Sequence, residues 1–306
     1  MLRPVFWFGF ASANPRLTFN KTYPFFSKLS NLLMDQDIGG HSTAFASTGR
    51  VDRWWVEPLA TGAGFLCFVV YTTWAMFQAG HYWAGSYLSP LYSPLFYIEP
   101  LAAGAAPMDH AWFGSWPQWW PAWLPPSPAI FILAGPLAFR MTCYYYRKFY
   151  YRSYFATPPA CAVTSLPQKK YKGESALFLF QNIHRYTLYI AIGYIFLLGY
   201  DAGLAFFRDG EFGVGVGTLV LCLNVILLSG YTFGCHAFRH LVGGRGDCFS
   251  CSAGKEHLGH KAWNQVSKLN ARHMMWAWIS MIWVGFTDFY VRMVSMGVFT
   301  DFNTWD

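Results

Sequence analysis

The sequence predicts an all-α, polytopic membrane protein with five transmembrane helices, an N-terminal interfacial arm and an outer loop rich in Pro and Trp. Charged residues make up only 12% of the 306 residues, and aromatic residues make up 21%. A soluble domain typically carries about 25% charged residues. Trp and Tyr are enriched at both membrane–water interfaces, so the aromatic content also favours a protein embedded in lipid.

The elements follow from the apolar runs taken in chain order. Residues 1–56 carry several basic residues, and we expect a cytoplasmic arm that lies on the membrane surface or contacts a partner. A transmembrane domain is expected at 57–295 and a short outer tail at 296–306. A helix needs about 20 apolar residues to cross the hydrocarbon core. Five segments meet or approach that length, near 57–80, 127–147, 183–206, 212–235 and 270–295.

Basic residues mark one side of the predicted bundle. Residues 81–126 contain no Lys or Arg, whereas the segments before and after this loop are rich in both. The positive-inside rule therefore predicts a cytoplasmic N-terminus and an outer C-terminus. The net charge of +7 is confined to segments between apolar runs, a pattern of membrane topology rather than of nucleic-acid binding.

The predicted outer loop, 81–126, is built largely of Pro, Trp and Gly. This composition indicates a compact cap that lies flat at the interface rather than a flexible linker. No cytoplasmic loop is long enough to form a catalytic domain. Soluble chemistry would therefore have to come from another subunit.

Cysteines and histidines gather near the predicted cytoplasmic face. The chain has seven cysteines, an odd number, and five lie in or beside basic segments, which argues against a secreted disulfide framework. Four histidines fall at about one depth, together with Cys143 and Cys235: His184, His236, His240 and His273. Polar residues at membrane depth are costly and mark functional sites.

The distribution of histidines discriminates between redox cofactors. The outer halves of the second to fifth helices hold no histidine, which disfavours a pair of haems, one near each face. A single haem with two of the four histidines stays open. A Rieske-type [2Fe–2S] centre instead takes two Cys and two His, and the cytoplasmic-side group contains both residue types. The composition of this group therefore favours the cluster.

Two further sequence patterns give weaker indications of function. The loop after the fourth helix contains Cys248-x2-Cys251 and His257-x2-His260, which predicts a possible small zinc or iron–sulfur site. Asp288 and Arg292 are spaced i, i+4 near the outer end of the fifth helix, and an ion pair that fixes helix packing is the expected role.

Four runs of sequence carry a resemblance to a known family. They are FRMTCYYYRKFYYRSYFATPPACAV (139–163), QNIHRYTLY (181–189), YTFGCHAFRHLVGG (231–244) and VSKLNARHMMWAWISMIWVGFTDFYVR (266–292). In this order they resemble the five-helix, cytochrome b-like membrane-anchor subunit of actinobacterial-type succinate dehydrogenase or fumarate reductase, complex II. The resemblance implies a multi-pass protein of the bacterial cytoplasmic membrane, with partner flavoprotein and iron–sulfur subunits, the former carrying the succinate-oxidising site.

The resemblance also implies a Rieske-type [2Fe–2S] cluster close to the cytoplasmic face, which passes electrons to quinone, with menaquinone as the expected acceptor. Four ligands are expected from seven candidates: Cys143, Cys161, His184, Cys235, His236, His240 and His273. In this family a second Cys can follow the first by three residues in the fourth-helix motif, where this chain has Phe238.

Aromatic and basic residues at the same depth are candidate quinone contacts: Trp55, Tyr146, Arg147 and Tyr186. Two alternatives to the cluster stay open, an anchor with a single haem b and a non-redox scaffold or transporter with zinc in the Cys248 loop. The quinone type, the direction of catalysis and any higher oligomer are left open by the sequence.

Overall fold

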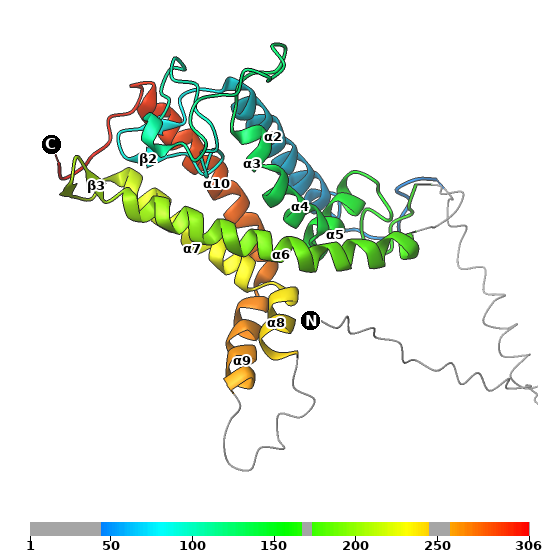
Figure 1. The fold of residues 1–306 in the computed structure, drawn as a ribbon. Coiled ribbons are helices and arrows are strands. Elements are labelled where there is room, and N and C mark those ends of the chain that lie inside the picture. Colours follow the sequence, from blue (N-terminus) through cyan, green and yellow to red (C-terminus); the bar gives the residue numbers. More distant parts are fainter. Residues whose placement is uncertain (1–43, 167–172, 245–257, 306) are drawn as a thin grey trace, which may run out of the picture.

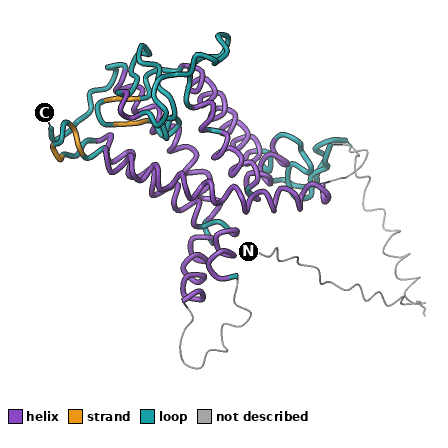
Figure 2. The backbone as a smooth tube through the Cα atoms, viewed as in Figure 1, coloured by secondary structure: helices purple, strands orange, loops and turns teal. Residues whose placement is uncertain are grey.

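The computed structural model describes residues 44–166, 173–244 and 258–305, which form a bundle of helices joined by short turns and one long irregular loop (Figures 1 and 2). The elements in chain order are α2 (Val56–Gln78), β1 (Trp83–Ala84), β2 (Tyr87–Leu88), η1 (Met108–His110), α3 (Ala129–Ile132), α4 (Ala134–Thr142), α5 (Tyr144–Ser153), α6 (Gly173–Leu204), β3 (Phe207–Arg208), β4 (Glu211–Phe212), α7 (Val216–Phe233), α8 (His236–Gly243), α9 (Leu258–Asn270) and α10 (His273–Ser295). The strands form two small antiparallel hairpins, β1 with β2 and β3 with β4.

Three helical segments are long and apolar enough to cross a membrane: α2, Gln181–Leu204 within α6, and α7. Helix α10 has 23 residues, but it contains Asp288, Arg292 and several polar side chains and is not among the three. The chain is thus a mostly helical membrane protein, and the expectation of five spans goes beyond these three helices.

The second expected span, 127–147, is not one continuous helix. The apolar helical segment Ala129–Thr142 stops before Cys143, whose backbone is extended, and α5 starts in a new direction at Tyr144. At 1.5 Å per residue this segment is about 21 Å long, shorter than the hydrocarbon core of about 30 Å. The fourth expected span, 212–235, contains α7, which is long and apolar enough to cross a membrane, and α8 begins just beyond it, after Cys235.

Helix packing arranges α4, α6, α7 and α10 side by side. Contacts join α4 to α6, α6 to α7, and α7 to α10, while α2 packs on α5 and α10. Helices α8 and α9 pair with each other and extend away from the bundle (Figure 1). The breaks before α5 and α8 and the start of α10 therefore fall in one region of the molecule, at the end predicted to be cytoplasmic.

The predicted outer loop divides into two parts. Its first part is core: Tyr82 stacks on Tyr92 with ring centroids 4.5 Å apart, and both pack with Leu95 and Ile98 in a buried cluster. This part packs against α2 and α10, and its place relative to the membrane surface stays a prediction. The second part exposes large aromatic side chains, namely Trp112, Phe113, Trp119 and Trp123.

One buried carboxylate, that of Asp288, holds the predicted outer end of the bundle together. Asp288 accepts hydrogen bonds from Tyr71 (2.6 Å) and Ser89, and it pairs with Arg292 at 3.3 Å. Arg292 Nη1 also donates to the Gly80 carbonyl at 2.7 Å. Because these partners belong to α2, α10 and the loop between α2 and α3, the ion pair fixes helix packing, as the i, i+4 spacing indicated.

Candidate metal centre

Two cysteines occupy matching positions where a helix is interrupted. Cys143 separates α4 from α5, and Cys235 separates α7 from α8. Each is the N-cap of the second helix and has nearly the same extended backbone, with φ −67° and ψ 138° at Cys143 and φ −67° and ψ 144° at Cys235. Both are free thiols and only 2% exposed. Both thiols therefore lie buried at the start of a helix.

A histidine lies beside each thiol. His184 Nε2 on α6 is 3.0 Å from the Sγ atom of Cys235. His273, the first residue of α10, places its Nε2 atom 3.8 Å from the Sγ atom of Cys143. Four separate parts of the chain thus deliver two Cys–His pairs to one level of the bundle.

Aromatic rings join the two pairs into one buried cluster. Phe139 stacks on the His184 ring with centroids 4.6 Å apart, and Tyr231 stacks on the His273 ring at 5.1 Å. Phe139 and Tyr231 meet edge to face at 5.4 Å, and both thiols belong to the same core cluster. Thr142 Oγ1 lies 2.9 Å from His184 Nδ1 and fixes that ring. Packing therefore holds all four candidate ligands; Cys143, Cys235 and His273 are buried, and His184 is partly buried.

Two details mark the His273 side of the cluster. Its Nδ1 atom is buried and has no hydrogen-bond partner in the described part of the chain. A Cβ atom added at Gly234 would lie 2.5 Å from the Gly230 carbonyl and 3.4 Å from His273 Nδ1. The short distance is to a carbonyl of α7 itself, so the glycine relieves crowding at the end of that helix, while the distance to His273 is an ordinary van der Waals contact.

Two buried arginines accompany the cluster. Arg140 on α4 donates to the Tyr146 hydroxyl and the Ala277 carbonyl, and its guanidinium lies 4.8 Å from the centre of the Tyr231 ring. Arg147 on α5 is 4% exposed. Its Nε and Nη1 atoms are buried without a hydrogen-bond partner among the described residues.

Three of the seven predicted ligands lie apart from the two pairs. His236 and His240 face each other on α8, with ring centroids 4.7 Å apart. Cys161 is exposed, and the Arg152 guanidinium lies 3.9 Å from its sulfur. Within the described residues no group of three or more His, Cys, Asp or Glu side chains is already arranged as a metal site, so the donors stand as pairs.

The second possible metal site falls mostly outside the described residues, which include neither Cys248, Cys251 nor His257. The remaining member, His260, lies on α9, where its Nε2 atom is 3.1 Å from Asn264 Nδ2. This site stays a prediction.

The four candidate quinone contacts do not form one site. Trp55 and Tyr186 are exposed on the outside of the helices, whereas Tyr146 and Arg147 are buried. Tyr146 lines a cavity of about 270 Å³ between α2, α4, α6 and α7. Most of its walls are apolar side chains, and one end reaches Arg140 and Tyr231 of the Cys–His cluster.

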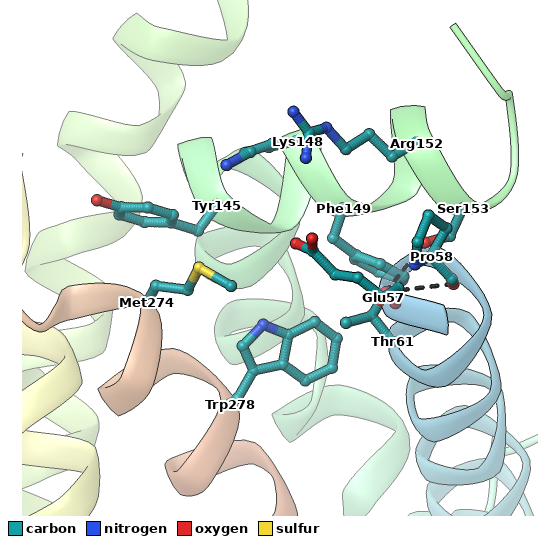
Figure 3. Close-up of a pocket in the computed structure, with 10 residues that line it drawn as sticks. All are labelled: Glu57, Pro58, Thr61, Tyr145, Lys148, Phe149, Arg152, Ser153, Met274 and Trp278. Carbon is teal, nitrogen blue, oxygen red and sulfur yellow. Dashed lines mark hydrogen bonds between the residues drawn. The ribbon is translucent and has the colours of Figure 1, made fainter. Parts of the chain in front are cut away.

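A second, smaller pocket lies between α2, α5 and α10 (Figure 3). Glu57 from α2 projects toward Trp278 of α10, while Lys148 and Arg152 lie on the far side of α5 in this view. Its volume of about 20 Å³ is enough for about one water molecule. This pocket is therefore too small for a quinone head group.

Sequence reasoning missed Arg140, Thr142, Tyr231 and Gly234 as parts of the site. Arg140 offers a usable signal, since it is the one charged residue in the apolar run from 127 to 146, and such residues mark functional sites in membranes. The other three depend on which helices pack together, which the sequence pattern does not specify.

Comparison with known proteins gives two matches. Residues 56–297 match the family described as actinobacterial succinate dehydrogenase subunit SdhC. A chain of the solved structure titled Mycobacterium smegmatis Sdh1 complex in the apo form is 43% identical, with a TM-score of 0.73 over 83% of this chain and 92% of that chain. A search of curated protein sequences found no match.

Proposed function

Since the chain belongs to the actinobacterial succinate dehydrogenase SdhC family and is the membrane-anchor subunit of such a complex, we propose that it connects the soluble iron–sulfur subunit electronically to membrane quinone. The carrier is a Rieske-type [2Fe–2S] centre held by Cys143, His184, Cys235 and His273. The observation that supports this most strongly is the meeting of two Cys–His pairs in one buried cluster.

The donor set fits the chemistry of such a centre. A Rieske-type centre takes two thiolates and two imidazoles, and when bound it supplies one-electron transfer. The buried, unpartnered Nδ1 atom of His273 is a feature that a bound group would explain. Cys143 supplies the second thiol, so the Phe at position 238 does not leave the set incomplete.

The surrounding residues have separate tasks in this proposal. Cys143 and Cys235 present the two thiols from the starts of α5 and α8. Thr142 orients the His184 ring, and hydrogen bonds of this kind set which ring nitrogen is available to a ligand. Phe139 and Tyr231 cover both imidazoles and exclude water, which affects the reduction potential.

The 270 Å³ cavity is the proposed quinone site. Its apolar walls suit an isoprenoid tail, and the few polar groups at one end suit the head group. Arg140 and Tyr146 are the polar side chains there that also contact the Cys–His cluster region. Trp55 and Tyr186, being exposed, fit an interfacial belt better than a quinone contact. We keep menaquinone as the proposed acceptor.

The partners and orientation complete the proposal. The flavoprotein and iron–sulfur subunits dock on the cytoplasmic face of the bacterial membrane, and succinate is oxidised on the flavoprotein. The described basic residues on that face include Arg50, which is paired with Asp52. This hydrogen-bonded pair holds the pKa of the Asp52 carboxyl below its usual range.

Electron paramagnetic resonance of the purified, dithionite-reduced complex tests the proposed centre. We expect a Rieske-type signal that disappears in Cys143→Ser and Cys235→Ser, with iron and acid-labile sulfide lost in parallel. His236→Ala is the matched control, because His236 lies outside both pairs. A haem Soret band without a Rieske-type signal would favour the single-haem anchor instead, and zinc without iron would favour the non-redox protein.

A further inference from the structure

Two guanidinium groups are buried beside the candidate centre without a carboxylate to neutralise them. Arg147 is 4% exposed, with Nε and Nη1 unpartnered in the part of the chain that the structure describes. Arg140 is 9% exposed and donates to neutral oxygens only, on Tyr146, Ala277 and Ser280. The ion pairs found among the described residues involve other cations, namely Arg50, His110 and Arg292.

A buried cation without a counter-charge strongly destabilises a protein. A guanidinium stays charged in proteins, so deprotonation does not remove this destabilisation. The two side chains therefore favour the more negative state of any group beside them. Arg147 lies one helical turn after Cys143, and its backbone N–H donates to the Cys143 carbonyl at 3.0 Å. The Arg140 guanidinium lies 4.8 Å from the centre of the Tyr231 ring, which stacks on His273. Both arginines therefore lie next to the candidate ligands.

We propose that Arg140 and Arg147 supply the counter-charge of the centre and raise its reduction potential. This inference rests on the proposed function. Two ferric ions, two sulfides, two thiolates and two neutral imidazoles sum to zero charge. Uptake of one electron from the soluble iron–sulfur subunit breaks no bond and leaves a net negative charge. Two fixed cations nearby stabilise that reduced form more than the neutral oxidised form.

The contacts of Arg140 explain how the charge stays in place. Its hydrogen bonds to the Tyr146 hydroxyl and to the Ala277 carbonyl on α10 fix the guanidinium, and the faces of the Tyr146 and Tyr231 rings lie 5.6 and 4.8 Å from it. A preorganised charge of this kind needs no rearrangement when the electron arrives. The low exposure of both side chains also limits screening by water and salt.

The test is an EPR-monitored redox titration of the whole complex carrying Arg147→Gln or Arg140→Gln. We expect each variant to lower the midpoint potential by about 59 mV, which is tenfold in the equilibrium constant of a one-electron couple. Arg147→Lys and Arg140→Lys retain the charge and should stay close to the wild-type value. Arg152→Gln is the matched control, because Arg152 lies further along α5, on the side away from α10 (Figure 3).

The outcomes separate this inference from the proposed function. A wild-type complex without a Rieske-type signal would refute the proposed function itself. A wild-type signal whose midpoint is the same in both Gln variants would overturn the inference alone. If a Gln variant loses the EPR signal, the Lys variant at that position decides between two explanations. A Lys variant that keeps the signal with a near wild-type midpoint potential supports the counter-charge. A Lys variant that also loses the signal would show that the shape of the arginine side chain is required, and would overturn the inference.

Discussion

The Nε2 atom of His184 lies 3.0 Å from the Sγ atom of Cys235, although 51 positions separate the two residues in the chain. His184 is on α6, and Cys235 is the residue at which α7 gives way to α8. Packing of α6 on α7 brings them together. A second Cys–His contact joins Cys143 to His273. Each of the two helix interruptions thus places a thiol beside a histidine.

Removal of one imidazole tests whether both pairs are needed. We expect His184→Ala and His273→Ala each to abolish the EPR signal of the centre and quinone reduction, while succinate oxidation with a soluble electron acceptor continues. His240→Ala keeps its iron in this account, because His240 contacts His236 and lies outside both pairs. Normal iron content in His273→Ala would exclude His273 as a ligand.

The close approach at Gly234 predicts a steric effect. In Gly234→Ala the new Cβ atom would lie 2.5 Å from the Gly230 carbonyl. Overpacking of this kind typically costs about 1–3 kcal/mol. We expect a lower thermal unfolding temperature and less bound iron than in the wild type.

Gly193→Ala is the matched control for that substitution. Gly193 lies within α6, and a Cβ atom there would meet nothing within 4 Å. Alanine is favoured over glycine inside a helix by about 1 kcal/mol. Gly193→Ala should therefore be neutral or slightly stabilising, and equal destabilisation by the two substitutions would argue against the steric explanation.

The cavity makes a separate prediction for quinone. Val69 lines it from α2, whereas Val70, the next and more exposed residue, does not; the two side chains are 36% and 61% exposed. We expect Val69→Trp to raise the KM for quinone at least several-fold by filling the cavity, with the EPR signal unchanged. Val70→Trp should retain wild-type kinetics. If both variants behave alike, quinone binds elsewhere.

The ion pair at the predicted outer end governs stability rather than electron transfer. Both Asp288 and Arg292 have side chains that are 0% exposed. Asp288→Asn leaves the Arg292 charge buried and unpaired, which typically costs about 3–5 kcal/mol. Thermal unfolding of the complex should show a clear loss of stability. Asp109→Asn removes an exposed carboxylate paired with His110 and should change little.

Several features of the fold could be predicted from composition and hydropathy. The spans α2 and α7, the helical part of α6 and the buried Asp288–Arg292 pair all follow from local patterns. The interruption at Cys143 could not be read in this way, because no Gly or Pro adjoins it, and tertiary packing decides where α4 ends. At Cys235 the preceding Gly234 is a helix-ending residue, in keeping with the expected end of the fourth span at 235.

Part of the candidate site could also be predicted from the sequence. The sequence indicated that the histidines and thiols lie at a similar depth in the membrane, because depth depends only on position along each span. Selecting two pairs from that group required knowing which helices touch. His236 and His273 lie at similar predicted depth, yet only His273 faces a thiol. The role of Tyr146 at the end of a cavity was likewise invisible, because cavities form between helices.

Nitrogen hyperfine spectroscopy of the reduced complex tests the central claim most directly. The account predicts a [2Fe–2S] signal coupled to two imidazole nitrogens. Replacement of His184 or His273 removes this coupling, whereas replacement of His236 leaves it unchanged. A signal without imidazole coupling, or a haem in place of the cluster, would contradict it.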